Sequence, residues 1–258
     1  MIKIPSLLRQ YLPTSKVLTL SLLTLCGSQW SQAADYYFLP DSVGSNNGTS
    51  FDNAYGWSDF GIAGMAHFLN QTMGPGDRML IGSGTFDGQK LTITTSGTAA
   101  NPKEIIGVDT GAGLPLLTKG SWSPTSPSSG NYSLIQFDSA GIDYWKISGL
   151  ELQGAQYAIY SPNASAPSTN IHLSDIQISR VRHGIYVSNL DDSSIENVRI
   201  THYTKHAFRL EKGCNNLEFI DCLADLSNGD TSWWDDSEAI PFGFNILGSS
   251  GAPNTNIT

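Results

Sequence analysis

Residues 173–178 read LSDIQI and residues 195–200 read IENVRI, and the same pattern appears as ISGLEL at 147–152 and as LEFIDC at 217–222. The four strings start 26, 22 and 22 positions apart. Within each string apolar and polar residues alternate, which is the period of a half-buried β-strand. The chain therefore repeats a short strand with a spacing of about 22 residues.

Each string is followed by a second apolar position, and three of the strings share a residue suited to a bend. Gly149, Asp175 and Asn197 occupy one place, and these residue types tolerate the left-handed backbone of a sharp turn. The second apolar position follows the start of its string by 12, 12, 13 and 27 residues, at Ile159, Ile185, Phe208 and Phe244. Two or three very short strands in each repeat predict a parallel β-helix, in which every coil stacks its apolar side chains on the next.

Composition and pattern exclude the other main classes. Leucine-rich repeats have a similar length, but their fixed leucine and asparagine pattern is missing, and strict alternation argues against helical solenoids. Charged residues are only 14% of the chain while hydrophobic residues are 40%, which excludes a coiled coil and a disordered chain. A formal net charge of −9 and a pI of about 4.8 argue against a nucleic-acid partner.

Residues 1–33 have the features of a secretory signal peptide. Three basic residues precede an apolar run at 17–26, and Ser31 and Ala33 place small side chains at the −3 and −1 positions of a cleavage site. The run is too short to span a bilayer comfortably, and no other segment is apolar enough. We therefore expect a secreted protein, extracellular or periplasmic, that is monomeric and not held in a membrane.

The rest of the chain divides into three parts: an N-terminal cap with the first coils (34–120), a Ser- and Pro-rich loop (121–131) and the main coils (132–258). Residues 57–73 predict a short amphipathic helix that caps the stack. Residues 252–258, APNTNIT, echo residues 166–172, APSTNIH, as if another coil began there. Because an uncovered sheet edge is an aggregation hazard, we expect the coils to be incomplete at the C-terminus, as in a fragment of a longer protein.

Three stretches carry a family resemblance: YYFLPDSVGSNNGTS at 36–50, GPGDRMLIGSGTF at 74–86 and TAANPKEII at 98–106. They resemble the start of secreted right-handed parallel β-helix proteins, in particular the pectate-lyase superfamily with its polysaccharide lyases. The resemblance implies an all-β, right-handed, single-stranded solenoid. It does not specify the reaction, because the same fold also holds glycoside hydrolases, esterases, epimerases and non-catalytic fibres.

The coil that follows Cys222 is longer than the others by 15 residues, from the lags of 27 and 12, and is rich in carboxylates. A long irregular segment in a repeat fold is usually functional, and Ca²⁺ takes six to eight oxygen ligands. In the lyases that the chain resembles, such an ion neutralises the substrate uronate and acidifies its C5 proton. We expect the calcium ligands to be Asp230, Asp235, Asp236 and Glu238, with Trp233 and Trp234 binding substrate beside them.

One departure from the family pattern leaves alternatives open. The family has Asp-Gly-Phe followed soon by a Lys, whereas residues 241–246 read PFGFNI and lack both the Asp and the Lys. In one alternative, the acidic segment is a solvated loop anchored by its tryptophans. A glycoside hydrolase with paired carboxylates is a further alternative, although neighbouring residues say little about a carboxyl separation.

A second group of residues emerges when the coils are aligned. Three tetrapeptides occupy one place in successive repeats: QYAI at 156–159, RHGI at 182–185 and KHAF at 205–208. Residues that share a place stack about 4.8 Å apart, so we expect Arg182 over Lys205 and His183 over His206. Like charges in a column are destabilising unless something uses them, and an acidic polysaccharide lying along the stack supplies the counter-charge.

These residues suggest roles in β-elimination, which needs a base for the C5 proton of a uronate. Since Lys or Arg serves in several lyase families, we assign Lys205 as the base and Arg182 as the clamp for the substrate carboxylate. The other residues that we expect to bind substrate are Arg180, His183, His206 and Arg209. The alternative is that polar columns simply line the solvent face, with Glu211 and nearby aspartates pairing the cations.

Two cysteines remain outside the signal peptide, Cys214 and Cys222. Cys222 falls at an inward position shared with Leu152 and Ile200, which favours a core thiol over a redox centre. A disulfide between the two cysteines stays open, because an exported chain permits one.

Three function hypotheses follow from these observations. The first is a Ca²⁺-dependent lyase-like enzyme that cleaves an acidic, uronate-containing polysaccharide by β-elimination. The second is a non-catalytic β-helix that binds glycan or acts as an adhesin. The third is a structural fragment of a larger enzyme. Loss of turnover without loss of glycan affinity in Lys205→Ala favours the first over the second.

Overall fold

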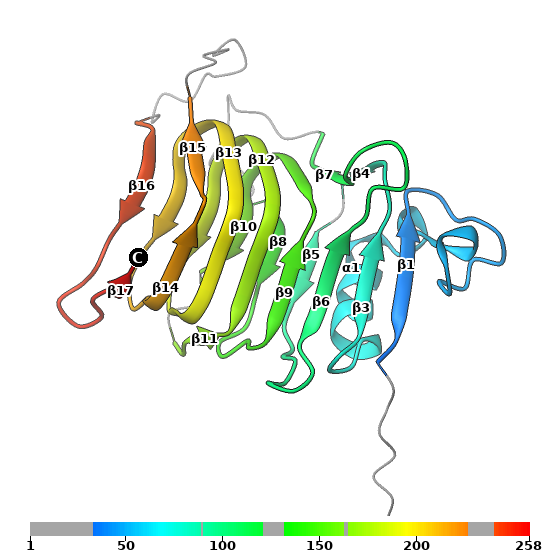
Figure 1. The fold of residues 1–258 in the computed structure, drawn as a ribbon, viewed down its shortest axis with the longest axis horizontal. Coiled ribbons are helices and arrows are strands. Elements are labelled where there is room, and N and C mark those ends of the chain that lie inside the picture. Colours follow the sequence, from blue (N-terminus) through cyan, green and yellow to red (C-terminus); the bar gives the residue numbers. More distant parts are fainter. Residues whose placement is uncertain (1–32, 89, 121–131, 163–164, 227–239) are drawn as a thin grey trace, which may run out of the picture. The chain divides into compact units, whose positions relative to one another are not determined.

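The computed structural model describes residues 33–88, 90–120, 132–162, 165–226 and 240–258. Within them the chain is an all-β, right-handed parallel β-helix with one short α-helix. Figure 1 shows the coils following one another from β1 (Asp35–Leu39) to β16 (Phe242–Ile246). The fold expected from the repeat and the resemblance is confirmed. In the described part of the chain, no helix is long and apolar enough to cross a membrane.

Three parallel sheets run along the stack, and the longest strands bend through more than one of them. Sheet 1 contains β1, β3 (Arg78–Ile81), β6 (Lys103–Gly107), β9 (Trp145–Ser148), the starts of β12 (Ile171–Val187) and β13 (Leu190–Leu210), β14 (Asn215–Ile220) and β17 (Thr255–Ile257). Sheet 2 contains β4 (Thr85–Asp87), β7 (Leu116–Thr118), the start of β10 (Glu151–Ser161), the middles of β12 and β13, and β15 (Leu223–Asp225). Sheet 3 contains β5 (Leu91–Ile93), β8 (Ser133–Phe137), the ends of β10, β12 and β13, and β16. The short β2 (Tyr55–Gly56) pairs with β1, and β11 (Ser168–Thr169) pairs with β13.

The corner between sheets 1 and 2 is made by the bend residues that the repeat predicts. Their φ angles are 70° at Gly149, 54° at Asp175, 49° at Asn197 and 50° at Asp221. The Asn197 side chain also donates a hydrogen bond of 2.7 Å to Asp175 Oδ1 on the preceding coil. One position in each repeat thus turns the chain, and at two of the coils it also ties neighbours together.

The fourth coil begins two residues later than the sequence pattern predicts. Phe219 pairs with Ile195 and Leu217 pairs with Ser193, so the fourth string is FIDCLA at 219–224 and LEFIDC was wrong. Side chains in a strand alternate with a period of two, so a shift by two residues preserves the apolar pattern. The bend at Asp221 decides the register, because Asp tolerates a left-handed backbone better than Phe.

This register also corrects the placement of Cys222. The column of Leu152 and Ile200 continues at Ala224, and the offset of 24 residues puts Cys222 in the place of Val198. Cys222 still packs against the core, and both cysteines are free thiols.

The N-terminal helical segment is confirmed, but it divides into three pieces. A 3₁₀-helix (Trp57–Asp59) is followed by α1 (Gly61–His67) and a π-helix (Phe68–Thr72). Phe68 and Leu69 are buried, and the Phe68 ring lies edge-on to Phe38 of β1 at 5.1 Å. The segment thereby covers apolar residues of the first coil.

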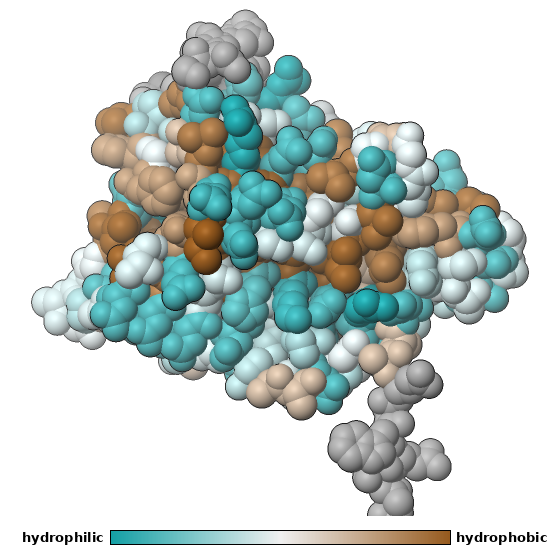
Figure 2. Space-filling view, in the orientation of Figure 1, coloured by the Kyte–Doolittle hydropathy of each residue, from teal (hydrophilic) through white to brown (hydrophobic). Residues whose placement is uncertain are grey.

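The other end of the stack exposes apolar side chains. Figure 2 shows hydrophobic residues gathered over the β14–β16 end. Phe244 stacks on Phe208 with ring centroids 4.6 Å apart, yet Phe244 is 47% exposed and Phe208 only 1%. The difference arises because no described coil covers Phe244. Residues 252–258 enter sheet 1 through β17, where Thr255 pairs with Asn215.

Candidate functional site

Sheet 3 carries two neighbouring columns of residues, one entirely apolar and the other containing two histidines and a tyrosine. The inner column, which fills the core, contains Ile159, Ile185, Phe208 and Phe244. Two residues earlier on each coil lies a second set, which we call the aromatic–histidine column: Tyr157, His183, His206 and Phe242. His183 thus pairs with His206, as the alignment of the coils predicts.

The backbones of neighbouring coils approach each other closely at Gly184, which lies between the two columns. A Cβ on Gly184 would meet Ala207 O at 2.5 Å and Ile200 Cδ1 at 2.5 Å, so only glycine fits there. Because Ile200 and Ala207 fill the space on the inner side of Gly184, the side chain of the preceding residue, His183, lies on the outer side. His183 accordingly contacts Tyr186, with ring centroids 5.4 Å apart.

The rings of the aromatic–histidine column lie nearly parallel along the stack. Ring centroids are 4.9 Å apart between Tyr157 and His183, 4.9 Å between His183 and His206, and 5.8 Å between His206 and Phe242. Tyr160, one position beyond the inner column, stacks on Tyr157 at 4.1 Å. Four coils therefore build a continuous stack of rings beside the outer face of sheet 3, and three of these rings, Tyr157, His183 and His206, are buried.

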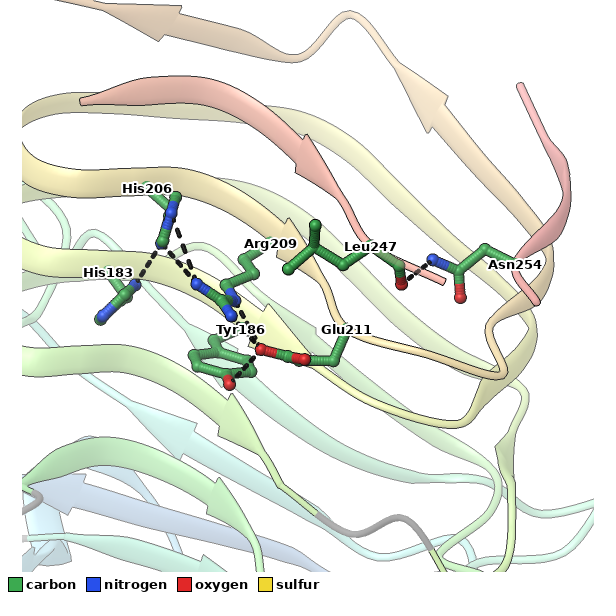
Figure 3. A network of polar contacts seen from close by, with 7 residues as sticks. All are labelled: His183, Tyr186, His206, Arg209, Glu211, Leu247 and Asn254. Carbon is green, nitrogen blue, oxygen red and sulfur yellow. Dashed lines mark hydrogen bonds and ion pairs between the residues drawn. The ribbon is translucent and has the colours of Figure 1, made fainter. Parts of the chain in front are cut away.

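A network of polar contacts joins this column to the outer face (Figure 3). We call His183, Tyr186, His206, Arg209 and Glu211 the His–Arg cluster. The Nδ1 atoms of His183 and His206 are 3.0 Å apart, so one ring donates its proton to the other. The Arg209 guanidinium lies over the Tyr186 ring, with Cζ 4.9 Å from the centroid, and its Nη1 is 3.4 Å from both nitrogens of His206.

Glu211 orients the two side chains that face outward. Arg209 Nε donates to Glu211 Oε1 at 2.7 Å, and Arg209 Nη2 contacts the same oxygen. The Tyr186 hydroxyl donates to that oxygen at 2.6 Å. A single carboxylate oxygen therefore holds both the guanidinium and the phenol in one geometry.

Burial and charge set the protonation of the cluster. Burial lowers the pKa of His183 to about 2, and the positive charges of Arg182, Arg209 and Lys205 act in the same direction. The pKa of His206 falls to about 4, again chiefly through burial. Burial raises the pKa of Glu211, but hydrogen bonds from Tyr186 and Arg209 outweigh it and the pKa lies below its usual value. At neutral pH the histidines are therefore uncharged, and Glu211 is ionised.

The structure brings together five of the residues singled out in the sequence: the pair of His183 and His206, and around it Arg182, Lys205 and Arg209. The register offset grows from 22 at Val181 to 23 at His183, so two residues, Thr204 and Lys205, lie opposite Arg182. This extra residue is a β-bulge. Arg182 is buried, and Lys205 is half-buried.

Arg180 lies at a different place from the cluster. It occupies the corner between sheets 2 and 3 with φ 51°, is exposed, and is not among the charges that act on the histidine pair. The remaining predicted positions lie outside the described residues: Trp233, Trp234, Asp230, Asp235, Asp236 and Glu238. Across the ranges that the structure does describe, no group of three or more His, Cys, Asp or Glu residues is arranged to hold a metal ion.

Sequence reasoning missed the tyrosines of the site. Tyr160 and Tyr186 pair in register and project outward one position after the apolar Ile159 and Ile185. Their spacing of 26 residues equals that of the first two strings, so the repeat itself carried the signal.

No family model matches the sequence, and no curated protein matches it either. Among solved structures, the chain is similar to a rhamnogalacturonan lyase, with a TM-score of 0.52, 13% identity, and 84% of this chain and 63% of that one covered. It is also similar to a pectate lyase (TM-score 0.43, 18% identity, 88% and 62% covered) and to an alginate lyase from a Paenibacillus strain (TM-score 0.36, 18% identity, 76% and 58% covered). The chain thus spans about three fifths of the length of these structures. At these identities the likeness shows the fold alone.

Proposed function

We propose that the protein acts outside the cytoplasm on an acidic, uronate-containing polysaccharide, which it binds along the outer face of sheet 3 and cleaves by β-elimination. The observation that carries this proposal is the convergence of Arg182, Lys205 and Arg209 on one histidine pair beside a row of tyrosines. A guanidinium binds a carboxylate through two parallel hydrogen bonds. Aromatic faces offer a flat apolar surface for a sugar ring.

In this proposal the outward groups bind and orient the substrate. Tyr160 and Tyr186 pack against sugar rings, and Arg209, supported by Arg182, binds the uronate carboxylate. Tyr186 and Glu211 already hold the Arg209 guanidinium in one orientation, which reduces the ordering cost on binding. Since the histidines are neutral, they support the cations by contact without adding charge.

The reaction requires one base and one proton donor. Lys205 takes the C5 proton, the electron pair forms the C4–C5 double bond, and the C4–O bond breaks. The leaving oxygen then takes a proton from water or from a tyrosine hydroxyl. Tyr160 keeps its proton at neutral pH, because burial raises its pKa and the charge of Glu211 raises it further.

We also propose a calcium ion, held by Asp230, Asp235, Asp236 and Glu238. Such an ion would neutralise the substrate carboxylate when bound. The support is the density of carboxylates in that segment, which the sequence alone provides. Trp233 and Trp234 would contact the substrate beside it.

The first test mixes the purified chain with polygalacturonate, alginate and glycosaminoglycans and follows the ultraviolet absorbance of the unsaturated uronate product. We expect absorbance to rise on at least one substrate in the presence of Ca²⁺, and a chelator to abolish the rise. A folded chain that gives no rise on any substrate contradicts the lyase. A rise that survives the chelator contradicts only the calcium.

The second candidate is a glycan-binding module. The burial of His183 and His206, which are 3% and 2% exposed, favours it. Variants separate this module from the lyase. Lys205→Ala should abolish turnover and keep affinity for the polysaccharide. Arg209→Ala should weaken affinity and its dependence on salt. Lys146→Ala is the matched control, because Lys146 is a half-exposed cation of sheet 1 and should leave both unchanged. Loss of affinity alone in Lys205→Ala supports the binding module.

A further inference from the structure

A hollow lies on sheet 2, a different sheet from the one that carries the His–Arg cluster. It sits between β4 and the 3₁₀-helix of residues 57–59, has a volume of about 370 Å³, and is lined by Asp41, Trp57, Ser58, Thr85 and Asp87 among others. Small-molecule sites have volumes of roughly 300–1,000 Å³. Another hollow on sheet 2, beside Gln153 and Gln177, measures about 190 Å³ and falls below that range.

The wall of the larger hollow contains a buried donor that lacks an acceptor. Trp57 is 2% exposed, and its indole Nε1 makes no hydrogen bond within the described structure. The indole is held edge-on to Phe86, with ring centroids 4.9 Å apart. Buried polar groups without partners are rare in folded proteins, because such a group loses its hydrogen bonds to water. Because Nε1 itself is buried, a ligand in this hollow would satisfy the indole only by bringing an acceptor oxygen against the wall that Trp57 forms.

The other lining groups specify the kind of ligand. Asp41 and Asp87 are exposed carboxylates that accept hydrogen bonds, and Ser58 and Thr85 add two hydroxyls that both donate and accept. Two carboxylates repel an anion, so an acidic sugar is disfavoured. A neutral compound with several hydroxyl groups matches both the carboxylates and the indole N–H.

The hollow also lies at the head of two columns of side chains along sheet 2. Thr85 pairs in turn with Leu116, Glu151, Gln177, Arg199 and Leu223. Asp87 pairs in turn with Thr118, Gln153, Ser179, Thr201 and Asp225. Neighbouring coils repeat every 4.7–4.9 Å. The Asp87 column therefore offers a hydrogen-bonding side chain on every coil, and the Thr85 column does so at every coil except those of Leu116 and Leu223. A polymer seated at Trp57 can therefore continue along them.

We propose that the Trp57 hollow is a binding site for a neutral hexose residue of a glycan whose chain follows the two polar columns. The site does not depend on the lyase proposed for sheet 3. It takes neutral sugar, whereas the His–Arg cluster carries Arg209, which suits a uronate. The protein would then hold a polysaccharide with neutral and acidic regions at two faces.

The test follows the side-chain indole N–H signals of the full chain by NMR, with the Trp57 signal assigned from its loss in Trp57→Phe. The probes are galactose, glucose and mannose, their β-1,4-linked hexasaccharides, and galacturonate as the charged match of galactose. We expect the Trp57 signal to move with a neutral sugar at millimolar concentration, more strongly with its hexasaccharide, and not with galacturonate. Movement with galacturonate as large as with galactose overturns the proposal, as does no movement with any neutral sugar.

Two variants complete the test. Trp57→Phe removes the donor and should weaken binding about tenfold. If that variant does not fold, Thr85→Val removes one exposed hydroxyl at nearly constant shape and should weaken binding several-fold. Arg209→Ala on sheet 3 should leave neutral-sugar binding unchanged. Binding that survives both sheet 2 variants but is lost in Arg209→Ala contradicts the site and assigns the sugar to sheet 3.

Discussion

The inner column and the aromatic–histidine column run side by side through the same coils, two residues apart, yet they differ in chemistry. Ile159, Ile185 and Phe208 are at most 1% exposed and entirely apolar. His183 and His206 are nearly as buried, at 3% and 2%, but they carry polar atoms that must be satisfied by each other and by Arg209. Burial of polar groups is costly where an apolar residue would serve. Packing alone therefore does not account for the polar rings of the second column.

The largest effect should come from the inner column. Phe208→Ala removes a ring that is 1% exposed and should lower the free energy of unfolding by about 3–5 kcal/mol, measured by denaturant titration. Phe244→Ala is the matched control, because the same position on the next coil is already 47% exposed. Its loss should be about 1 kcal/mol. Equal losses would show that the end of the stack is covered in solution.

The aromatic–histidine column should instead make stability depend on pH. The pKa values of His183 and His206 are lowered from 6.5 to about 2 and about 4 in the folded chain, so the unfolded chain binds more protons below pH 6.5. Stability should be full above pH 6.5 and should fall by up to several kcal/mol as the pH drops from 6.5 towards 4, because both histidines contribute in this range. Chemical denaturation across this range measures the slope.

The paired variant His183→Phe with His206→Phe should flatten this slope and keep the rings stacked between Tyr157 and Phe242. Glu211 also loses stability on protonation, but it acts in the lower range where a carboxylate titrates. A slope between pH 6.5 and 5 that persists in the double variant would assign it to groups other than the histidine pair.

Gly184, which lies between the two columns, should tolerate no added atom. Gly184→Ala places a Cβ 2.5 Å from Ala207 O and from Ile200 Cδ1, so it should destabilise the chain by about 1–3 kcal/mol. Gly248→Ala is the matched control, since the nearest atom to its Cβ is Pro253 Cα at 3.4 Å. If Gly184→Ala melts at the temperature of the unchanged chain, the space beside Gly184 is not tightly packed.

The repeat predicted the inner column well because apolar spacing reports burial directly. It also predicted His183 over His206, since each lies two positions before the inner-column residue of its coil, Ile185 or Phe208. The lag of 13 in the third coil signals an extra residue but not its place. The structure puts the bulge at Thr204 and Lys205, where the chain leaves sheet 2 and turns towards sheet 3.

Other features were hidden for physical reasons. Tyrosine is common both in cores and on surfaces, so Tyr160 and Tyr186 gave no direction until the register showed which side they face. The fourth coil was shifted by two residues because a period of two does not change under that shift. The hollow at Trp57 joins β4 to a helical segment distant in sequence, a contact that no local pattern reports.

The smallest effect should separate the two outward tyrosines of the cluster face. Tyr186→Phe keeps the ring under Arg209 but removes the hydroxyl that donates to Glu211 at 2.6 Å, so it should cost about 1 kcal/mol of stability. It should also raise the pKa of Glu211 towards its usual value, because one of the hydrogen bonds that lower it is gone. Tyr160→Phe is the matched control at the same register position, and it should leave the Glu211 pKa unchanged. An NMR titration of Glu211 in both variants decides the matter: an equal pKa in the two would mean that Arg209 alone holds the carboxylate, and the outward face would then be ordered by the guanidinium without help from the Tyr186 hydroxyl.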